Sequence, residues 1–163
     1  MAFGGWSDSS PRSRDVLEHL RPAALGELGI YGAIDRGSIR SLAENAGLAF
    51  DVELQGDARL LSLLGEAHAI AAYRLAQEAV TNVVRHAHAT SCRVRMRAEQ
   101  RNGKLWLFLD VRDDGIGSTA FLRPGNGLTT MHDRVLALGG RLHLQDLGPG
   151  LRLHALLRQP MPR

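Results

Sequence analysis

The 163-residue sequence contains one cysteine, Cys92, so the chain cannot form an internal disulfide, which is typical of a reducing compartment. It has no run of about 18 apolar residues, so no segment is expected to span a membrane. The first ten residues lack the basic start and apolar run of a signal peptide. These absences predict a cytoplasmic domain, linked to a membrane only through regions outside this sequence.

Two common nucleotide-binding motifs are also missing. There is no Gly-Lys-Ser/Thr, which excludes a Walker A loop. No strand–helix–strand unit surrounds the glycine-rich segments, which excludes the dinucleotide fingerprint. His86 and His88 are two residues apart and do not share a helix face, so they are not expected to hold a metal. The net charge of +3 fits an acidic ligand such as a nucleotide, but it equally fits an arginine-rich surface.

Hydrophobic spacing predicts an alternation of helices and strands. Helical spacing covers residues 14–26 with a break at Pro22, then 30–46, 65–88 and 128–138. Alternation predicts strands at residues 48–54, 92–98, 105–111, 141–145 and 151–157. Short turns such as Asn102-Gly103 join consecutive strands, so the sheet should be mixed or antiparallel, with helices on one face. The predicted fold class is an α+β two-layer sandwich.

Domain boundaries follow from composition and from these elements. We expect a flexible leader at residues 1–13, a helical segment at 14–47, the main domain at 48–158 and a tail at 159–163.

The long helix carries a polar arc opposite its apolar side. At 100° per residue, Glu78, Asn82, Arg85 and His86 fall within roughly 100° of one another. Asn is a poor helix former in an interior position. Its amide oxygen suits Mg²⁺, Arg and His donate to phosphate, and Glu can orient or deprotonate a reacting group. A solvated helix face is the simpler alternative.

Two glycine-rich segments follow the strand at 105–111. In residues 113–117, Asp113 leaves a central strand beside glycines that allow close approach, so its carboxylate could accept a hydrogen bond from the adenine amine. In residues 125–127, a Gly-Asn-Gly sequence precedes a helix, whose free N–H groups attract phosphate. An ordinary turn and a flexible surface loop are the alternatives.

In combination, these segments resemble the ATP-binding domain of sensor histidine kinases that partner NarL-type response regulators. This domain belongs to the gyrase–chaperone–histidine kinase–mismatch repair ATPase superfamily. "QEAVTNVVRHAHA" is similar to the N box, "DDGIG" to the G1 box and "GNGLTTMHDRVLALGGRL" to the G2 box with its following helix. The resemblance covers roughly residues 15–158. It implies the Bergerat-type ATP-binding fold and the cofactors ATP and Mg²⁺.

The resemblance also implies a role for individual residues. Glu78 would be catalytic and Asn82 would coordinate Mg²⁺, while Arg85 and His86 would contact phosphates. Asp113 would bind the adenine amine. The remaining expected ATP-binding residues are Gly115, Gly117, Gly125, Gly127, Leu128 and Met131, which would shape the pocket and the mobile ATP lid. The expected partners are a dimerisation and phosphoacceptor domain of the same kinase and a NarL-type response regulator, with no nucleic acid.

The sequence departs from the family pattern at three places. Gly150-Leu151 stands where the family usually has Gly-Thr near the adenine. His132 stands where the subgroup often has Arg. No phosphoacceptor box is found, and the flanks of His19 do not match one. The resemblance therefore implies that the acceptor histidine lies outside this sequence.

Two other functions stay open from the sequence. An anti-sigma-factor-type serine kinase belongs to the same superfamily and needs no upstream histidine segment. A non-catalytic module could use Arg93, Arg95 and Arg97, which share one face of a strand, to bind an acidic partner or nucleic acid.

Overall fold

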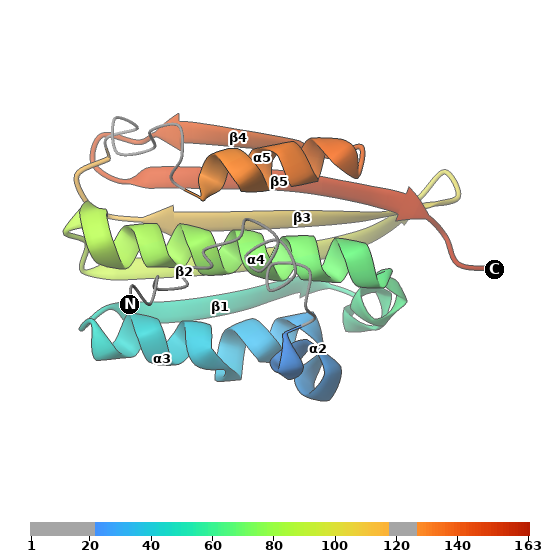
Figure 1. The fold of residues 1–163 in the computed structure, drawn as a ribbon, viewed down its shortest axis with the longest axis horizontal. Helices are drawn as coiled ribbons and strands as arrows, with labels where there is room; N and C mark the ends of the chain where they lie inside the picture. Colours follow the sequence, from blue (N-terminus) through green and yellow to red (C-terminus); the bar gives the residue numbers. More distant parts are fainter. Residues whose placement is uncertain (1–21, 118–126) are drawn as a thin grey trace, which may run out of the picture.

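The computed structural model describes residues 22–117 and 127–163 and shows a five-stranded sheet covered on one face by helices (Figure 1). The strands are β1 (Ala49–Gly56), β2 (Ser91–Arg101), β3 (Lys104–Asp113), β4 (Arg141–Asp146) and β5 (Leu151–Pro160). Their order in the sheet is β1-β2-β3-β5-β4. β1 is parallel to β2, and the other neighbours are antiparallel, so the predicted mixed sheet is confirmed.

The helical layer consists of α2 (Ala23–Arg36), α3 (Ser38–Asn45), α4 (Glu66–Asn82) and α5 (Leu128–Ala137). α4 lies across the middle of the sheet, α2 and α3 lie beside β1, and α5 lies over β5 and β4 (Figure 1). A 3-10 turn, η1 (Ala58–Leu63), leads from β1 towards α4, and a π-helical turn, η2 (Val83–Ala87), follows α4. The two-layer sandwich predicted from the sequence is therefore present.

The core lies between α4 and the inner face of the sheet. Small side chains on α4, including Ala72 and Ala76, are fully buried and let the helix approach the strands closely. Alternate residues of the central strands, such as Val94 and Leu109, fill the space beneath the helix. Burying a side chain of this size contributes about 1.5–3 kcal/mol of hydrophobic free energy, so this contact fixes where the polar side of α4 lies.

Some predicted boundaries were wrong. The helix expected at 30–46 is interrupted at Gly37, whose extended backbone ends α2 and begins α3. Gly37 packs so closely on the Ala33 carbonyl that a Cβ there would overlap it. At the other end, β5 continues to Pro160, past the strand predicted at 151–157, and the Gln159 side chain bonds the backbone of Gly65 and Leu63.

The predicted leader, the start of the predicted helix at 14–26, and His19 lie outside the described residues. Within the described residues, no helix is both long and apolar enough to cross a bilayer.

Candidate functional site

The polar side of α4 faces away from the sheet, as the helical wheel predicted. Glu78 and Asn82 are one helical turn apart and half-buried, and Arg85 follows in η2, where it is exposed. Burial raises the pKa of the Glu78 carboxyl, and the positive charge of Arg85 partly offsets that rise. A carboxyl with a raised pKa is a better proton acceptor near neutral pH than an ordinary glutamate.

The side-chain amide nitrogen of Asn82 is buried and has no hydrogen-bond partner among the described residues. A buried polar group without a partner costs roughly 1–3 kcal/mol, so native chains seldom keep one without a use. The amide also carries an oxygen, which is the ligand type that Mg²⁺ prefers. The donor chemistry at this position therefore fits a magnesium ion held together with phosphate oxygens. No cluster of three or more His, Cys, Asp or Glu side chains offers another metal site in the described part of the chain.

The end of this helix has an unusual backbone that the sequence did not predict. Residues 83–87 form a π-helical turn, and His88 ends it in the left-handed conformation with φ 49°. A π-turn is wider than an α-turn, so Arg85 and His86 do not keep the angles of an ideal helical wheel. Such turns are frequent at functional sites. The Ala87 carbonyl at the end of the turn accepts a hydrogen bond of 2.8 Å from the Ile116 N–H.

Asp113 is the last residue of β3 and is only 5% exposed. Burial raises the pKa of its carboxyl, while hydrogen bonds from the backbone N–H groups of Gly115 and Leu151 lower it. The bond from Gly115 is 2.8 Å long. Leu151, which replaces the family's threonine, thus still supplies a backbone donor at this position. A buried carboxylate held by backbone donors is a fixed acceptor for an amine donor.

The glycines beside Asp113 are required by close packing. A Cβ on Gly115 would overlap the Ala87 carbonyl, and one on Gly150 would overlap the Asp113 carbonyl. Gly117 has φ 72°, and a Cβ there would lie 2.6 Å from the Gly150 oxygen. These contacts hold the loop after β3 between the end of η2 and the turn from β4 to β5. The predicted pocket-shaping glycines are thus placed around Asp113.

Asp114 has a structural role that the sequence did not reveal. Its carboxylate accepts hydrogen bonds from the backbone N–H groups of Thr90 and Ser91, at 2.8 and 2.9 Å, and from the Thr90 hydroxyl, at 2.5 Å. These bonds hold the pKa of Asp114 well below its usual range. The residue therefore ties the loop after β3 to the start of β2.

The second glycine segment enters the described structure only at its end. Gly127 lies against the Glu78 carboxylate, leaving no room for a Cβ, and its carbonyl accepts a 3.0 Å hydrogen bond from the Met131 N–H. Met131 is buried in the core, and Leu128 begins α5. Gly125 lies outside the described residues. The structure thus brings Glu78, Gly127 and α5 together on one side of α4.

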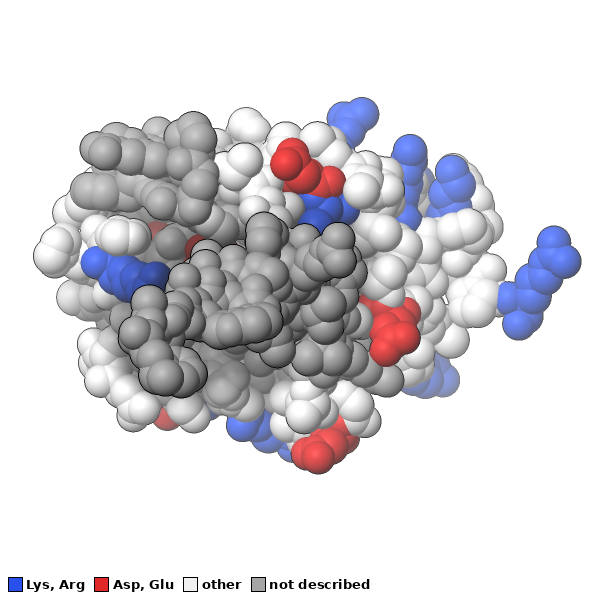
Figure 2. All heavy atoms as spheres, in the orientation of Figure 1, with Lys and Arg blue, Asp and Glu red and all other residues white. Residues whose placement is uncertain are grey.

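Cys92 and His132, two further residues singled out in the sequence, lie in different surroundings. Cys92 is buried, and burial raises the pKa of its thiol to about 12. His132 is exposed on α5 beside Asp133. Figure 2 shows acidic and basic side chains scattered among neutral ones on the coloured part of the helical side, without a continuous patch of one sign.

The arginines of β2 are paired on the outer face of the sheet. Arg93 binds Asp51 at 2.9 Å, Arg95 binds Glu53 at 3.0 Å, and Arg97 binds Glu99 at 2.5 Å. Arginines that already pair with acids attract a polyanion less strongly. The alternative of a non-catalytic module that binds an acidic partner or nucleic acid through these arginines therefore loses its main support.

Comparison with known proteins gives the family of this α/β sandwich. Residues 67–161 match the family described as histidine kinase-, DNA gyrase B-, and HSP90-like ATPase. The chain belongs to this family, as the resemblance of its three boxes implied.

Individual relatives are sensor histidine kinases. The chain is 35% identical over 135 residues to the signal transduction histidine-protein kinase/phosphatase UhpB of Salmonella typhimurium, covering 79% of this chain and 25% of UhpB. It is 32% identical over 145 residues to the sensor histidine kinase DesK of Bacillus subtilis, covering 86% and 36%. The chain thus spans only about a quarter to a third of the length of these relatives.

A solved structure supports the fold. The histidine kinase domain of the blue-light activated histidine kinase EL346 from Erythrobacter litoralis superimposes with a TM-score of 0.58 at 21% identity. The match covers 78% of this chain and 64% of that one.

Proposed function

We propose that this chain is the ATP-binding catalytic part of a two-component sensor histidine kinase. The observation behind the proposal is that one site combines two features: the buried Asp113 carboxylate, held by a backbone N–H, and the Asn82 side chain, whose buried amide nitrogen has no partner among the described residues, one helical turn from Glu78. Glu78 lies more than one helical turn before Ala87, whose carbonyl accepts a hydrogen bond from Ile116 in the loop after Asp113. The site therefore suits an elongated ligand with a base at one end and phosphates at the other.

Each group has a distinct role in this proposal. Asp113 accepts a hydrogen bond from the adenine amine, and Gly115 and Gly117 let the base approach the backbone. Asn82 offers its amide oxygen to Mg²⁺, which neutralises phosphate charge when bound. Arg85 and His86 donate to phosphate oxygens.

Glu78 orients an acceptor histidine and takes its proton. The histidine nitrogen bonds to the γ-phosphorus as the bond from phosphorus to the ADP oxygen breaks. Positioning and charge neutralisation supply most of the rate enhancement in such transfers. The glycines at 125 and 127 and Leu128 frame a lid over the phosphates, and Met131 anchors its base.

The acceptor is a histidine on a separate dimerisation domain of the same kinase, and the phosphoryl group passes on to a NarL-type response regulator. The similarity of the chain to sensor histidine kinases supports its assignment to a two-component system. The domain functions in the cytoplasm, and membrane attachment comes only through sensor regions. We do not expect nucleic acid to be a partner, because Arg93, Arg95 and Arg97 of β2 pair with neighbouring acids.

The test is calorimetric titration of the chain with ADP, with and without Mg²⁺. We expect binding that Mg²⁺ strengthens, and we expect Asn82→Ala to remove that Mg²⁺ effect. Asn45→Ala, at the exposed end of α3, is the matched control and should bind like the parent. Equal Mg²⁺ dependence in parent and Asn82→Ala would reject the metal assignment, and no ADP binding by the folded parent would reject the function.

A second measurement separates histidine from serine kinases. Incubated with γ-labelled ATP and Mg²⁺, the isolated chain should not acquire stable label, because its acceptor lies on another domain. Transfer of label to serine of a small acceptor protein would favour the serine kinase instead.

A further inference from the structure

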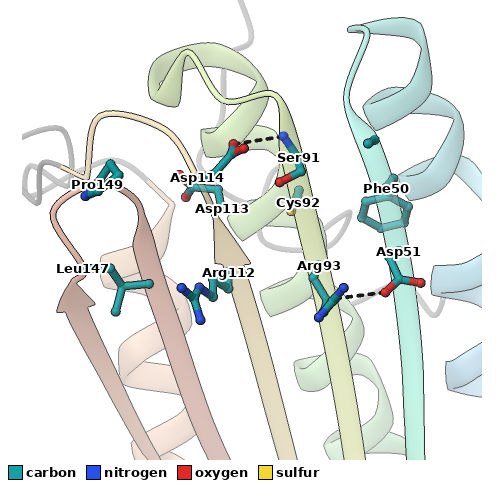
Figure 3. Close-up of a pocket in the computed structure, with 11 residues that line it drawn as sticks. Phe50, Asp51, Ser91, Cys92, Arg93, Arg112, Asp113, Asp114, Leu147 and Pro149 are labelled. Atoms are coloured by element: carbon teal, nitrogen blue, oxygen red, sulfur yellow. Dashed lines mark hydrogen bonds and ion pairs between the residues drawn. The ribbon is translucent and has the colours of Figure 1, made fainter.

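A pocket of about 580 Å³ opens on the outer face of the sheet, opposite the face that α4 covers, near the ends of β1, β2 and β3 (Figure 3). Arg93 and Arg112 project from neighbouring strands on this face, and Leu147 and Pro149 of the turn from β4 to β5 form the opposite wall. None of the roles proposed for nucleotide binding uses these four side chains.

Arg112 stands between two other arginines in the sheet register. It is directly opposite Arg93 on β2 and directly opposite Arg152 on β5. Like charges in directly opposed positions are destabilising, because their Cβ atoms are only about 5 Å apart. A row of three arginines across three adjacent strands is therefore an unfavourable arrangement unless negative charge compensates it.

The two outer arginines of the row have such compensation. Arg93 pairs with Asp51 at 2.9 Å, as Figure 3 shows, and Arg152 pairs with Asp110 at 2.5 Å. Arg112 makes no ion pair and no side-chain hydrogen bond with any residue of the described ranges. Its guanidinium carries a full charge and five N–H donors, in a geometry that fits carboxylate and phosphate oxygens.

Two carboxylates around the pocket already accept hydrogen bonds. The Asp114 carboxylate is held by Thr90 and Ser91, and Asp113 is buried with its carboxylate on the backbone N–H of Gly115. These two carboxylates therefore have hydrogen-bond donors, whereas the Arg112 guanidinium has no partner among the described residues and lies in the same pocket as the apolar Leu147 and Pro149.

We propose that this pocket binds a small organic anion, whose carboxylate or phosphate group pairs with Arg112 and whose apolar part lies against Leu147 and Pro149. The proposed contacts differ from those of the nucleotide site: Arg112 is exposed, whereas Asp113, which also borders the pocket, is buried and holds the Gly115 N–H. The binding step does not depend on the proposed kinase function.

The same contacts connect the two faces of the sheet. Pro149 precedes Gly150, whose N–H donates to the Gly115 carbonyl at 2.8 Å, and Arg112 precedes Asp113. An anion that orders Arg112 and Pro149 therefore acts on the two segments that hold Asp113. Its binding should change the amide signals of Gly115 and Leu151 as well as those of the pocket wall.

The experiment is a titration of the isotope-labelled chain with phenyl phosphate at low ionic strength, followed by NMR. Inorganic phosphate reports the contribution of the charge, and phenol reports that of the ring alone. We expect saturable binding of phenyl phosphate with a Kd of millimolar order, weaker binding of phosphate and no saturable binding of phenol. Shifts should centre on Arg112, Leu147 and the β4–β5 turn.

Variants test the assignment. Arg112→Ala should weaken phenyl phosphate binding at least about tenfold, as expected for loss of a charge-assisted pair. It should not lower the melting temperature, because it removes repulsion from the row. Arg141→Ala is the matched control, since Arg141 is also exposed on the outer face but lies at the far end of β4. Its affinity should stay within twofold of the parent.

Several results would overturn the proposal. These are an absence of saturable binding, unchanged affinity in folded Arg112→Ala, equal binding of phenol, or shifts centred on Glu78 and Asn82 that Arg85→Ala abolishes. The last result would place the anion on the other side of the sheet.

Discussion

Gly127 packs directly on the carboxylate of Glu78, and a Cβ at residue 127 would overlap that carboxylate. Gly127 also has φ 48°, in the region that favours glycine. The proposed lid therefore meets the proposed catalytic residue through a position that has no room for any side chain. This contact shows why Gly127 is needed, beyond the flexibility that glycine gives a loop.

Gly127→Ala should destabilise the fold for two separable reasons. Overlap with Glu78 should cost about 1–3 kcal/mol, and left-handed strain roughly another 1–2 kcal/mol. In a Glu78→Ala background only the strain should remain, so chemical denaturation of the four proteins should give a coupling energy between the two positions.

Gly139→Ala is the control for this cycle. Gly139 has φ 70° but no atom nearer than 4.0 Å to a Cβ, so its cost should be strain alone and should add to that of Glu78→Ala. Additive behaviour at Gly127 as well would show that the overlap is relieved elsewhere.

Asp114 should stabilise the fold only while it is ionised. Its pKa is lowered by hydrogen bonds from Thr90 and Ser91, so its contribution is present above its ordinary value of 3.8 and is lost as the pH falls below that value. Asp114→Ala should melt at a lower temperature than the parent at pH 7, and the difference should shrink in acid. Thr90→Val, which removes one hydroxyl donor, should give a smaller loss of the same sign. A difference that is independent of pH would contradict the role of the carboxylate charge.

Asp113 should show the opposite pH dependence. Its folded pKa is raised chiefly by burial, so the folded state takes up a proton more readily than the unfolded chain. Relative to Asp113→Asn, the parent should therefore gain stability as the pH falls from 7 towards 4, which thermal melts of both proteins would measure. Because both proteins retain Asp114, its titration largely cancels in the comparison. A parent that instead loses stability relative to Asp113→Asn would show that hydrogen bonding outweighs burial.

Cys92 should be unreactive in the folded chain. Burial raises its thiol pKa to about 12, so almost no thiolate exists at pH 8. Iodoacetamide should modify it only after unfolding in denaturant. Rapid alkylation of the native protein would show that β2 opens readily at its start.

The sequence predicted the parts of this molecule that depend on local pattern. The apolar side of α4, the hairpin at Asn102-Gly103 and the emergence of Asp113 from a central strand all follow from spacing and turn chemistry. The family resemblance then supplied the roles proposed for these residues, which remain to be tested.

What the sequence did not predict depends on contacts between distant segments. From the sequence alone, Asp114 looks like part of an ordinary turn. Its structural role depends on a hydrogen bond from Thr90, which lies twenty-four residues earlier in the chain. The sequence presents the arginines of β2 as a free basic face, because the acids that pair with Arg93 and Arg95 lie on β1, and the register of that parallel pairing has no local signal. The interruption at Gly37 was missed because apolar helical spacing continues on both sides of it.

The most direct test of the proposed pocket compares ADP with inosine diphosphate, in which a carbonyl replaces the exocyclic amine of adenine. If Asp113 binds that amine, calorimetry should show ADP binding at least about a hundredfold tighter than inosine diphosphate, because the analogue sets an acceptor against a buried carboxylate. In folded Asp113→Asn, most of this preference should disappear. Equal affinities of the parent for both nucleotides would contradict the assignment of Asp113 and of the site built around it.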